Sequence, residues 1–169
     1  MQTNITLKRI KSNNNFEFFK ADYLIPAPKE DESQNIVLPL FDTPVSAGFP
    51  SPADDYVDIY LDLNKQLIEH PNATFYVRVK GSSMKNSQIS HGDLLIVDRS
   101  LEPQNNDIVL GVLNGEFTVK KLIINKGNVF LMPENENYHP IKITEEMDFQ
   151  VWGVVSYVIH DAKNRKTKL

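Results

Sequence analysis

The pattern of hydrophobic and polar positions changes near residue 72. Beyond this point, short runs rich in β-branched and aromatic residues alternate with polar turns, which is typical of strands. We predict strands over Phe75–Lys80, Asp93–Asp98, Asp107–Leu113, Glu116–Ile124, Asn128–Met132 and Phe149–Ile159. The spacing of these strands predicts a mainly β fold, with a compact, largely antiparallel domain over residues 72–160.

Two short turns are expected between neighbouring strands of this domain. Asn114-Gly115 separates two of the predicted strands, and this dipeptide favours the type I′ turn of a tight hairpin. Gly127 indicates a second turn between the next two strands.

The first part of the chain has a different character. Residues 1–47 contain four prolines and no sustained periodicity, so we expect an extended arm, compatible with short strands at Phe16–Phe19 and Ile36–Leu40. Residues 48–71 are expected to form a linker and a short helix. Ser51 would cap the helix, Pro52 would occupy its first position, and the helix would run toward Leu67-Ile68 before His70-Pro71 ends it. Residues 161–169 form a basic, solvated tail.

Composition narrows the classes of function. At 169 residues with 41% hydrophobic residues, the chain suits one modest domain with a real core and an extra segment. A net charge of −4 argues against a dedicated nucleic-acid-binding protein. The absence of cysteine excludes disulfides and a cysteine nucleophile, and the four histidines lack the spacing of a metal site. We expect no cofactor, no membrane association and a cytoplasmic protein.

Ser83 is the first candidate for chemistry. It follows a predicted strand in the sequence Gly81-Ser82-Ser83-Met84. Gly81 permits a sharp turn that would expose the following N–H groups, and such groups can stabilise an oxyanion. Small residues after a strand more often form only a turn, so this motif alone is weak.

Lys120 and Lys121 lie in an otherwise apolar strand and point to opposite faces. A buried lysine loses solvation of its charged form, which lowers its pKa and lets the neutral amine act as a general base toward a serine. Alternation does not choose between the two lysines, and both could instead extend their charges into water. His91 could serve a Ser-His-Asp arrangement, but its surroundings favour a surface turn.

Several segments in one order resemble the LexA/UmuD family of self-cleaving serine peptidases, the S24 class, and most of all its UmuD branch. The resemblance covers residues 47–160 and rests on segments that include Ala47-Gly48-Phe49-Pro50, Gly81-Ser82-Ser83-Met84, Ile89-Ser90-His91-Gly92-Asp93-Leu94 and Gly115-Glu116-Phe117-Thr118-Val119-Lys120-Lys121.

The resemblance implies a role for each site residue. Ser83 would be the nucleophile and Lys120 the general base, since the position after that lysine can be arginine in relatives. The bond cut would be Ala47-Gly48. Backbone N–H groups of Ser83 and Met84 would form the oxyanion hole. Cleavage would remove residues 1–47 as an arm, which is longer here than in typical UmuD proteins.

The resemblance also implies a biological role in the SOS response. Contact with RecA on single-stranded DNA would stimulate cleavage. The trimmed homodimer would then join a UmuC-like polymerase subunit, with the replicative polymerase clamp as a further partner, in error-prone translesion synthesis. No direct sequence-specific DNA binding is expected.

Two other functions remain open. A LexA-type or phage-type repressor inactivated by self-cleavage would need a helix-turn-helix domain before the cut, and residues 1–47 are few and rich in proline for that. A binding module that keeps the fold without cutting is the other. A signal peptidase with a Ser-Lys pair is disfavoured because no segment reads as a membrane span.

Overall fold

The computed structural model describes residues 7–11, 17–21, 36–40 and 59–163. The chain divides into two compact units, one of residues 1–27 with 70–169 and one of residues 28–69. Ala47 and Gly48 lie outside the described residues, as do Ser51 and Pro52.

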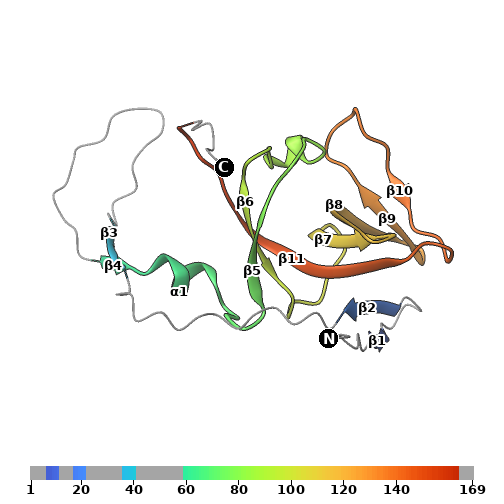
Figure 1. The fold of residues 1–169 in the computed structure, drawn as a ribbon, viewed down its shortest axis with the longest axis horizontal. Coiled ribbons are helices and arrows are strands. Elements are labelled where there is room, and N and C mark those ends of the chain that lie inside the picture. The colour runs from blue at the N-terminus through green and yellow to red at the C-terminus, as the bar shows by residue number, and fades with distance from the viewer. Residues whose placement is uncertain (1–6, 12–16, 22–35, 41–58, 164–169) are drawn as a thin grey trace, which may run out of the picture. The chain divides into compact units, whose positions relative to one another are not determined.

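A seven-stranded antiparallel sheet forms most of the larger unit (Figure 1). Its spatial order is β10-β9-β8-β7-β11-β6-β5. The strands are β5 (Thr74–Arg78), β6 (Leu94–Asp98), β7 (Ile108–Leu113), β8 (Glu116–Asn125), β9 (Asn128–Met132), β10 (Ile141–Lys142) and β11 (Phe149–Ile159). The expectation of a mainly β, antiparallel domain is therefore confirmed.

Both expected hairpin turns are present. Asn114 and Gly115 have φ values of 50° and 85°, and they connect β7 to β8. Positive φ at both central residues is the requirement of a type I′ turn, which matches the twist of the strands beside it. Lys126 and Gly127, with φ values of 45° and 78°, connect β8 to β9 in the same way.

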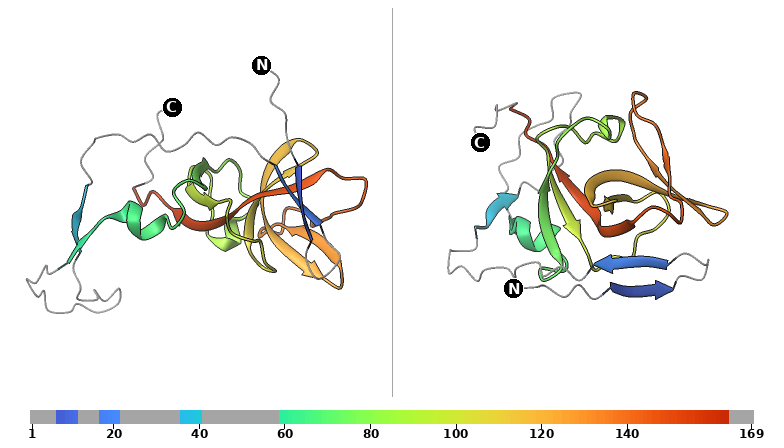
Figure 2. Two further views of the ribbon diagram at one scale, coloured as in Figure 1. Left: turned by 90° about the horizontal axis from the view of Figure 1, so that it is seen from below. Right: turned by 45° about the vertical axis from the view of Figure 1, so that its right-hand side comes forward.

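β11 is the strand that lets the sheet curl. It pairs with β7 along its first half and with β6 along its second, and its register shifts once in each half, between Val151 and Gly153 and between Val155 and Tyr157. Such bulges bend a strand and increase its twist. Figures 1 and 2 show the result, a sheet that wraps around an interior so that β5 and β8 face one another.

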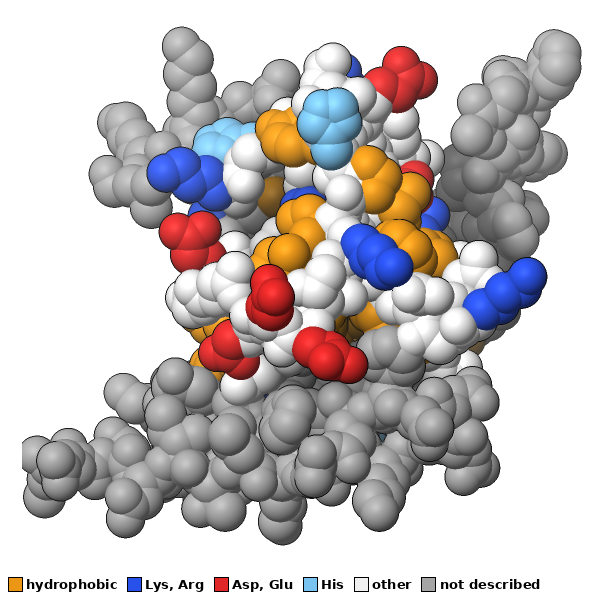
Figure 3. All heavy atoms as spheres, turned by 90° about the vertical axis from the view of Figure 1, so that its right-hand side faces the viewer, with side chains coloured by type: hydrophobic (Ala, Val, Ile, Leu, Met, Phe, Trp, Pro, Cys, Tyr) orange, Lys and Arg blue, Asp and Glu red, His pale blue; other side chains and the backbone are white. Residues whose placement is uncertain are grey.

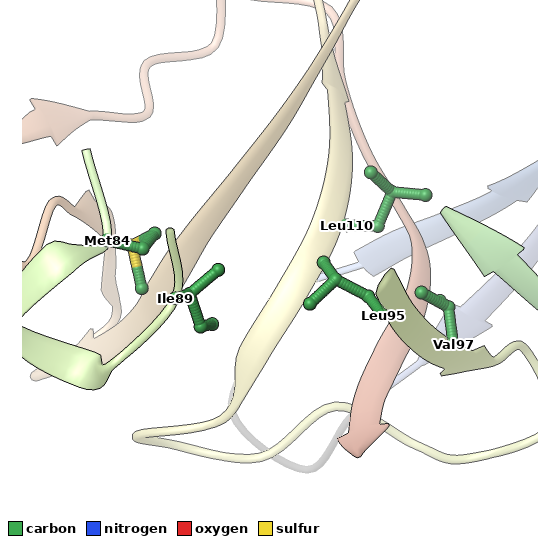
Figure 4. Close-up of a cluster of buried hydrophobic side chains, with 5 residues drawn as sticks. All are labelled: Met84, Ile89, Leu95, Val97 and Leu110. Atoms are coloured by element: carbon green, nitrogen blue, oxygen red, sulfur yellow. The ribbon is translucent and has the colours of Figure 1, made fainter. Parts of the chain in front are cut away.

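Two clusters of apolar side chains fill that interior. One consists of Met84, Ile89, Leu95, Val97 and Leu110, which come from the β5–β6 connection, β6 and β7 (Figure 4). The other consists of Val109, Leu122, Val129, Leu131 and Val151. Because the first cluster includes Met84, the segment that follows β5 is anchored in the core rather than free at the surface.

The smaller unit contains a short antiparallel pair, β3 (Leu38–Leu40) with β4 (Ile59–Leu61), and a one-turn helix, α1 (Leu63–Leu67). The predicted helix from Ser51 to Leu67-Ile68 is wrong over residues 59–61, which form β4. The helix begins later because Asp62 caps it, accepting hydrogen bonds from the backbone N–H groups of Asn64 and Lys65. β-branched and aromatic residues before Asp62 suit a strand better.

Strands β1 (Leu7–Lys11) and β2 (Glu17–Ala21) pair in a two-stranded antiparallel sheet. β2 and β3 overlap the short strands expected at Phe16–Phe19 and Ile36–Leu40, whereas β1, β4 and β10 were not expected. The described residues include no helix long and apolar enough to cross a membrane. The face shown in Figure 3 carries acidic, basic and apolar side chains together rather than one sign of charge.

Candidate active site

Ser83 lies in a turn that begins just after β5. Gly81, with a φ of 100°, reverses the chain, and a short 3-10 helix over Lys85–Ser87 follows. Between them, the side chain of Met84 is only 3% exposed because it packs into the first apolar cluster. Ser83 is therefore held beside the core, with its side chain partly buried.

Lys120 comes from the middle of β8, opposite Val109 of β7. Its side chain is 9% exposed. The amine Nζ lies 2.9 Å from Ser83 Oγ, 3.0 Å from Thr118 Oγ1 and 3.0 Å from the carbonyl oxygen of Val119. The structure therefore brings the two residues proposed from the sequence within hydrogen-bonding distance.

Lys121 lies on the other face of β8. Its Nζ forms an ion pair with Glu134 Oε1 at 2.6 Å and makes no described contact with Ser83 Oγ. The alternation of side chains along a strand accounts for this difference between adjacent lysines. Of the two candidates that the sequence pattern left open, Lys120 is the one beside the serine.

The environment of Lys120 favours its neutral form. Burial removes water from the ammonium and lowers the pKa of Lys120. The three described partners of Nζ are uncharged oxygens, so none supplies the negative charge that would restore the pKa. A neutral amine has a lone pair that can accept the Ser83 hydroxyl proton.

A cleft of about 260 Å³ opens over the Ser83–Lys120 pair. It lies between the end of β5 and the first half of β8, although β7, β11 and β6 separate those strands in the sheet. The curl of the sheet therefore creates the cleft. Its lining residues are Val77, Arg78, Val79, Lys80, Gly81, Ser83, Met84, Leu110, Phe117, Thr118, Val119 and Lys120.

The backbone N–H groups of Ser83 and Met84 are the donors nearest in sequence to the Ser83 side chain. Among the described residues, neither the Ser83 N–H nor the Met84 N–H donates to an acceptor. Both residues line the cleft. These two N–H groups are therefore available as hydrogen-bond donors, which is what the stabilisation of an oxyanion requires.

Other residues singled out from the sequence lie elsewhere or outside the described part. Ala47 and Gly48 fall in the segment between β3 and β4, whose structure is not described. His91 Nδ1 accepts a long hydrogen bond of 3.4 Å from the Gly81 N–H. The described residues contain no group of three or more side chains suited to a metal.

Sequence reasoning missed Thr118 and the β9–β10 loop, residues 133–140. Thr118 could have been found, because it precedes Lys120 by two positions and so shares its face of the strand. The loop gave no signal, since it meets the Ser83 turn across more than fifty residues of sequence, as in the bond from Asn135 to Ser82.

Several known proteins are similar to this chain over most of its length. Protein SamA of Salmonella typhimurium is 43% identical over 141 residues, which cover 83% of this chain and 97% of SamA. Protein ImpA of Escherichia coli is 43% identical over 137 residues, covering 79% of this chain and 89% of ImpA. Protein MucA of Escherichia coli is 40% identical over 121 residues, covering 71% of this chain and 82% of MucA.

A more distant similarity extends to repressors. The LexA repressor of Shewanella oneidensis is 40% identical over 127 residues, which cover 75% of this chain but 59% of the repressor. The family model described as Peptidase S24-like matches residues 39–156, a span that includes Ser83, Lys120 and the cleft between them. The chain belongs to the S24 family of serine peptidases.

Proposed function

We propose that this protein cuts its own Ala47-Gly48 bond, with Ser83 as the nucleophile and Lys120 as the general base. The observation that carries the proposal is the buried amine of Lys120, 2.9 Å from Ser83 Oγ. A serine hydroxyl needs a base to become nucleophilic, and Lys120 is the base at this position. The S24 family assignment supports the same chemistry.

The reaction proceeds in two halves. Neutral Lys120 takes the Ser83 proton while Oγ bonds to the carbonyl carbon of Ala47, and the Ser83 and Met84 N–H groups stabilise the oxyanion. The Ala47-Gly48 bond then breaks, the Gly48 amine takes the proton from Lys120, and residues 1–47 remain as an ester on Ser83. Lys120 next accepts a proton from water, whose oxygen attacks the ester, and Ser83 recovers its proton. The products are residues 1–47 with a free carboxylate and residues 48–169.

A bond within the same chain is a favourable substrate. The segment with the bond to be cut, residues 41–58, joins β3 to β4. These two strands pair with each other, with Leu38 opposite Leu61 and Leu40 opposite Ile59. Tethering gives the segment a high effective concentration at its own catalytic residues, so a site with few catalytic groups can suffice. RecA on single-stranded DNA would raise the population of the cleavable arrangement without adding a catalytic group.

We further propose that the trimmed protein acts in the SOS response as the accessory subunit of an error-prone translesion polymerase. It would do so as a homodimer bound to a UmuC-like subunit, with the polymerase clamp as a further contact. Support comes from the similarity to SamA, ImpA and MucA, which extends over most of each of those proteins. The clamp and polymerase contacts rest on the family resemblance alone.

The alternative function is that of a repressor inactivated by its own cleavage. The similarity to the LexA repressor supports this alternative. Against it, the net charge is −4, which does not favour a protein that binds nucleic acid. Gel-shift titrations of the uncut protein at stated salt separate the two functions. Sequence-specific retention of promoter DNA would favour the repressor.

Incubation of the purified full chain at alkaline pH tests self-cleavage. Intact-mass spectrometry should show two products, residues 1–47 and 48–169, formed at a first-order rate that does not change with protein concentration. Ser83→Ala should abolish both products, and Gly48→Glu should prevent cleavage by obstructing the bond. A wild-type chain that stays intact, with or without RecA filaments, would reject the proposed function.

A further inference from the structure

The turn that carries Ser83 is held from outside the cleft by the β9–β10 loop, residues 133–140. Asn135 Nδ2 donates to the carbonyl oxygen of Ser82 at 2.8 Å, and the Glu134 N–H donates to the carbonyl oxygen of Ser83 at 2.8 Å. A third hydrogen bond joins the same two segments, from the Asn86 N–H to the Glu134 carbonyl oxygen at 2.7 Å. No residue of this loop lines the cleft.

These bonds act on the peptide units that contain the two free donors. The Ser82 carbonyl and the Ser83 N–H belong to one planar trans peptide, so they point in opposite directions. The Ser83 carbonyl and the Met84 N–H are related in the same way. When the loop holds both carbonyl oxygens on its own side, it turns both N–H groups toward the opposite side, where Ser83 and Met84 line the cleft.

We infer that Asn135 is a positioning residue, which orients the Ser83 N–H as an oxyanion donor by holding the Ser82 carbonyl, an oxygen that also accepts from the Lys85 N–H at 3.2 Å. The inference rests on the proposed function, in that an oxyanion hole is needed only if Ser83 attacks a carbonyl. Glu134 does the same for the Met84 N–H through its backbone, which no side-chain replacement removes.

The loop is itself built to present Asn135. Asn135 Oδ1 accepts a hydrogen bond from the Asn137 N–H at 3.0 Å, which fixes the amide with its nitrogen toward Ser82. Glu134 is tied to β8 through its ion pair with Lys121 at 2.6 Å. Tyr138 adds a contact of its hydroxyl with Ser82 Oγ at 3.3 Å. The loop thus connects the strand of Lys120 to the turn of Ser83.

Asn135→Asp is the sharpest test, because it keeps the oxygen that accepts from Asn137 and removes the side-chain donor to the Ser82 carbonyl while the Lys85 N–H donor stays. Asn137→Asp is the matched control: it adds the same charge two positions away, where the exposed side chain makes no described hydrogen bond. Asn135→Ala removes the donor without adding charge. Each full-length variant is compared with wild type for the first-order cleavage rate across alkaline pH, thermal unfolding, and the amide resonances of Ser83 and Met84.

The expected result is a fall of about 10- to 100-fold in the cleavage rate of Asn135→Asp and Asn135→Ala, less than the loss of a donor outright. The ratio of the wild-type to the variant cleavage rate should be the same at every pH, because the Lys120–Ser83 contact is unchanged. The amide resonance of Ser83 should move in both variants. Asn137→Asp should cleave within about twofold of wild type.

The inference would be overturned if Asn135→Asp and Asn137→Asp cleaved at the same rate. It would also be overturned if the unfolded fraction of Asn135→Asp accounted for its lower cleavage rate. A shifted pH midpoint would overturn it as well, because it would indicate damage to the Lys120–Ser83 pair instead. If the wild-type chain never cleaves, the proposed function fails, and the Ser83 amide resonance alone decides the positioning: movement in Asn135→Asp but not in Asn137→Asp supports it, and equal spectra reject it.

Discussion

Thr118 Oγ1 lies 3.0 Å from Lys120 Nζ, on the same face of β8. The hydroxyl is a neutral partner that steadies the amine beside Ser83 without adding charge. Burial lowers the pKa of Lys120. A hydrogen bond to the ammonium form favours protonation, so loss of the Thr118 hydroxyl should lower that pKa further. In the proposed mechanism, the Thr118 hydroxyl therefore affects both the orientation of Lys120 and the pH at which Lys120 acts as a base.

Replacing Thr118 by valine should have two separable effects. The rate at high pH should fall about 10-fold because Nζ loses an orienting partner. The midpoint of the pH–rate profile should move to lower pH, since the ammonium form loses a stabilising hydrogen bond. Rates from wild type and Thr118→Val over the same pH series check both. Thr144→Val, at an exposed threonine, is the control and should change neither quantity.

Lys120 and Lys121 offer a matched pair of substitutions on adjacent residues. Lys120→Met should abolish cleavage, because no other described base contacts Ser83 Oγ. Lys121→Met should cleave within a few-fold of wild type and lose about 0.2–1 kcal/mol in the free energy of unfolding with its ion pair to Glu134. Equal activity in the two variants would show that Lys120 is not the base.

Asp98 should govern part of the acid stability. Burial alone raises its pKa, but hydrogen bonds from Ser100 and the contact with His70 outweigh burial and lower the pKa below the ordinary value. Its contribution is therefore present above the pKa of the unfolded chain and lost as pH falls through the folded pKa.

Asp98→Asn should lower the free energy of unfolding at neutral pH by about 1–3 kcal/mol and flatten its decline toward acid pH. Urea denaturation from neutral to acid pH measures both changes. Asp148→Asn, at an exposed aspartate, is the control and should leave the acid decline as it is in wild type. An equally steep decline in Asp98→Asn would contradict the assignment.

Gly153 is required by the close approach of β11 to β6. A Cβ at this position would lie 2.7 Å from Val97 Cγ1 and 2.9 Å from the Asp98 backbone oxygen. Gly153→Ala should cost about 1–3 kcal/mol in the free energy of unfolding, because the backbone of a central strand cannot move aside. Gly111→Ala, whose nearest obstacle is the Phe149 ring, should cost less because that half-buried side chain can shift. Thermal or urea unfolding of both variants compares them.

Local signals account for the parts of the fold that the sequence predicted well. β-branched runs located β5 to β9 and β11, and Asn114-Gly115 located a hairpin, because periodicity and turn chemistry act over a few neighbouring residues. The same signals misled at Ser51, where a good capping pattern predicted a helix across residues that form β4. β10, with two residues, is too short to produce a pattern.

The site shows the limit of single-sequence reasoning more clearly. The pattern around Lys120 and Lys121 could not decide which lysine faces inward, since both faces of that strand are apolar; the choice came from the family resemblance. Nothing local connects Asn135 to Ser82, because their contact depends on how the sheet curls and where the β9–β10 loop returns. Such contacts follow from packing, which one sequence does not display.

The protonation of Lys120 tests the central claim most directly. The Gly48→Glu variant keeps both Ser83 and Lys120 but should remain uncut, so the lysine can be titrated by NMR at its side-chain carbon and nitrogen. We predict a Lys120 pKa below that of an ordinary lysine, matching the midpoint at which wild-type cleavage accelerates. A Lys120 that titrates as a solvent-exposed lysine, or a cleavage rate that does not follow its titration, would contradict the account.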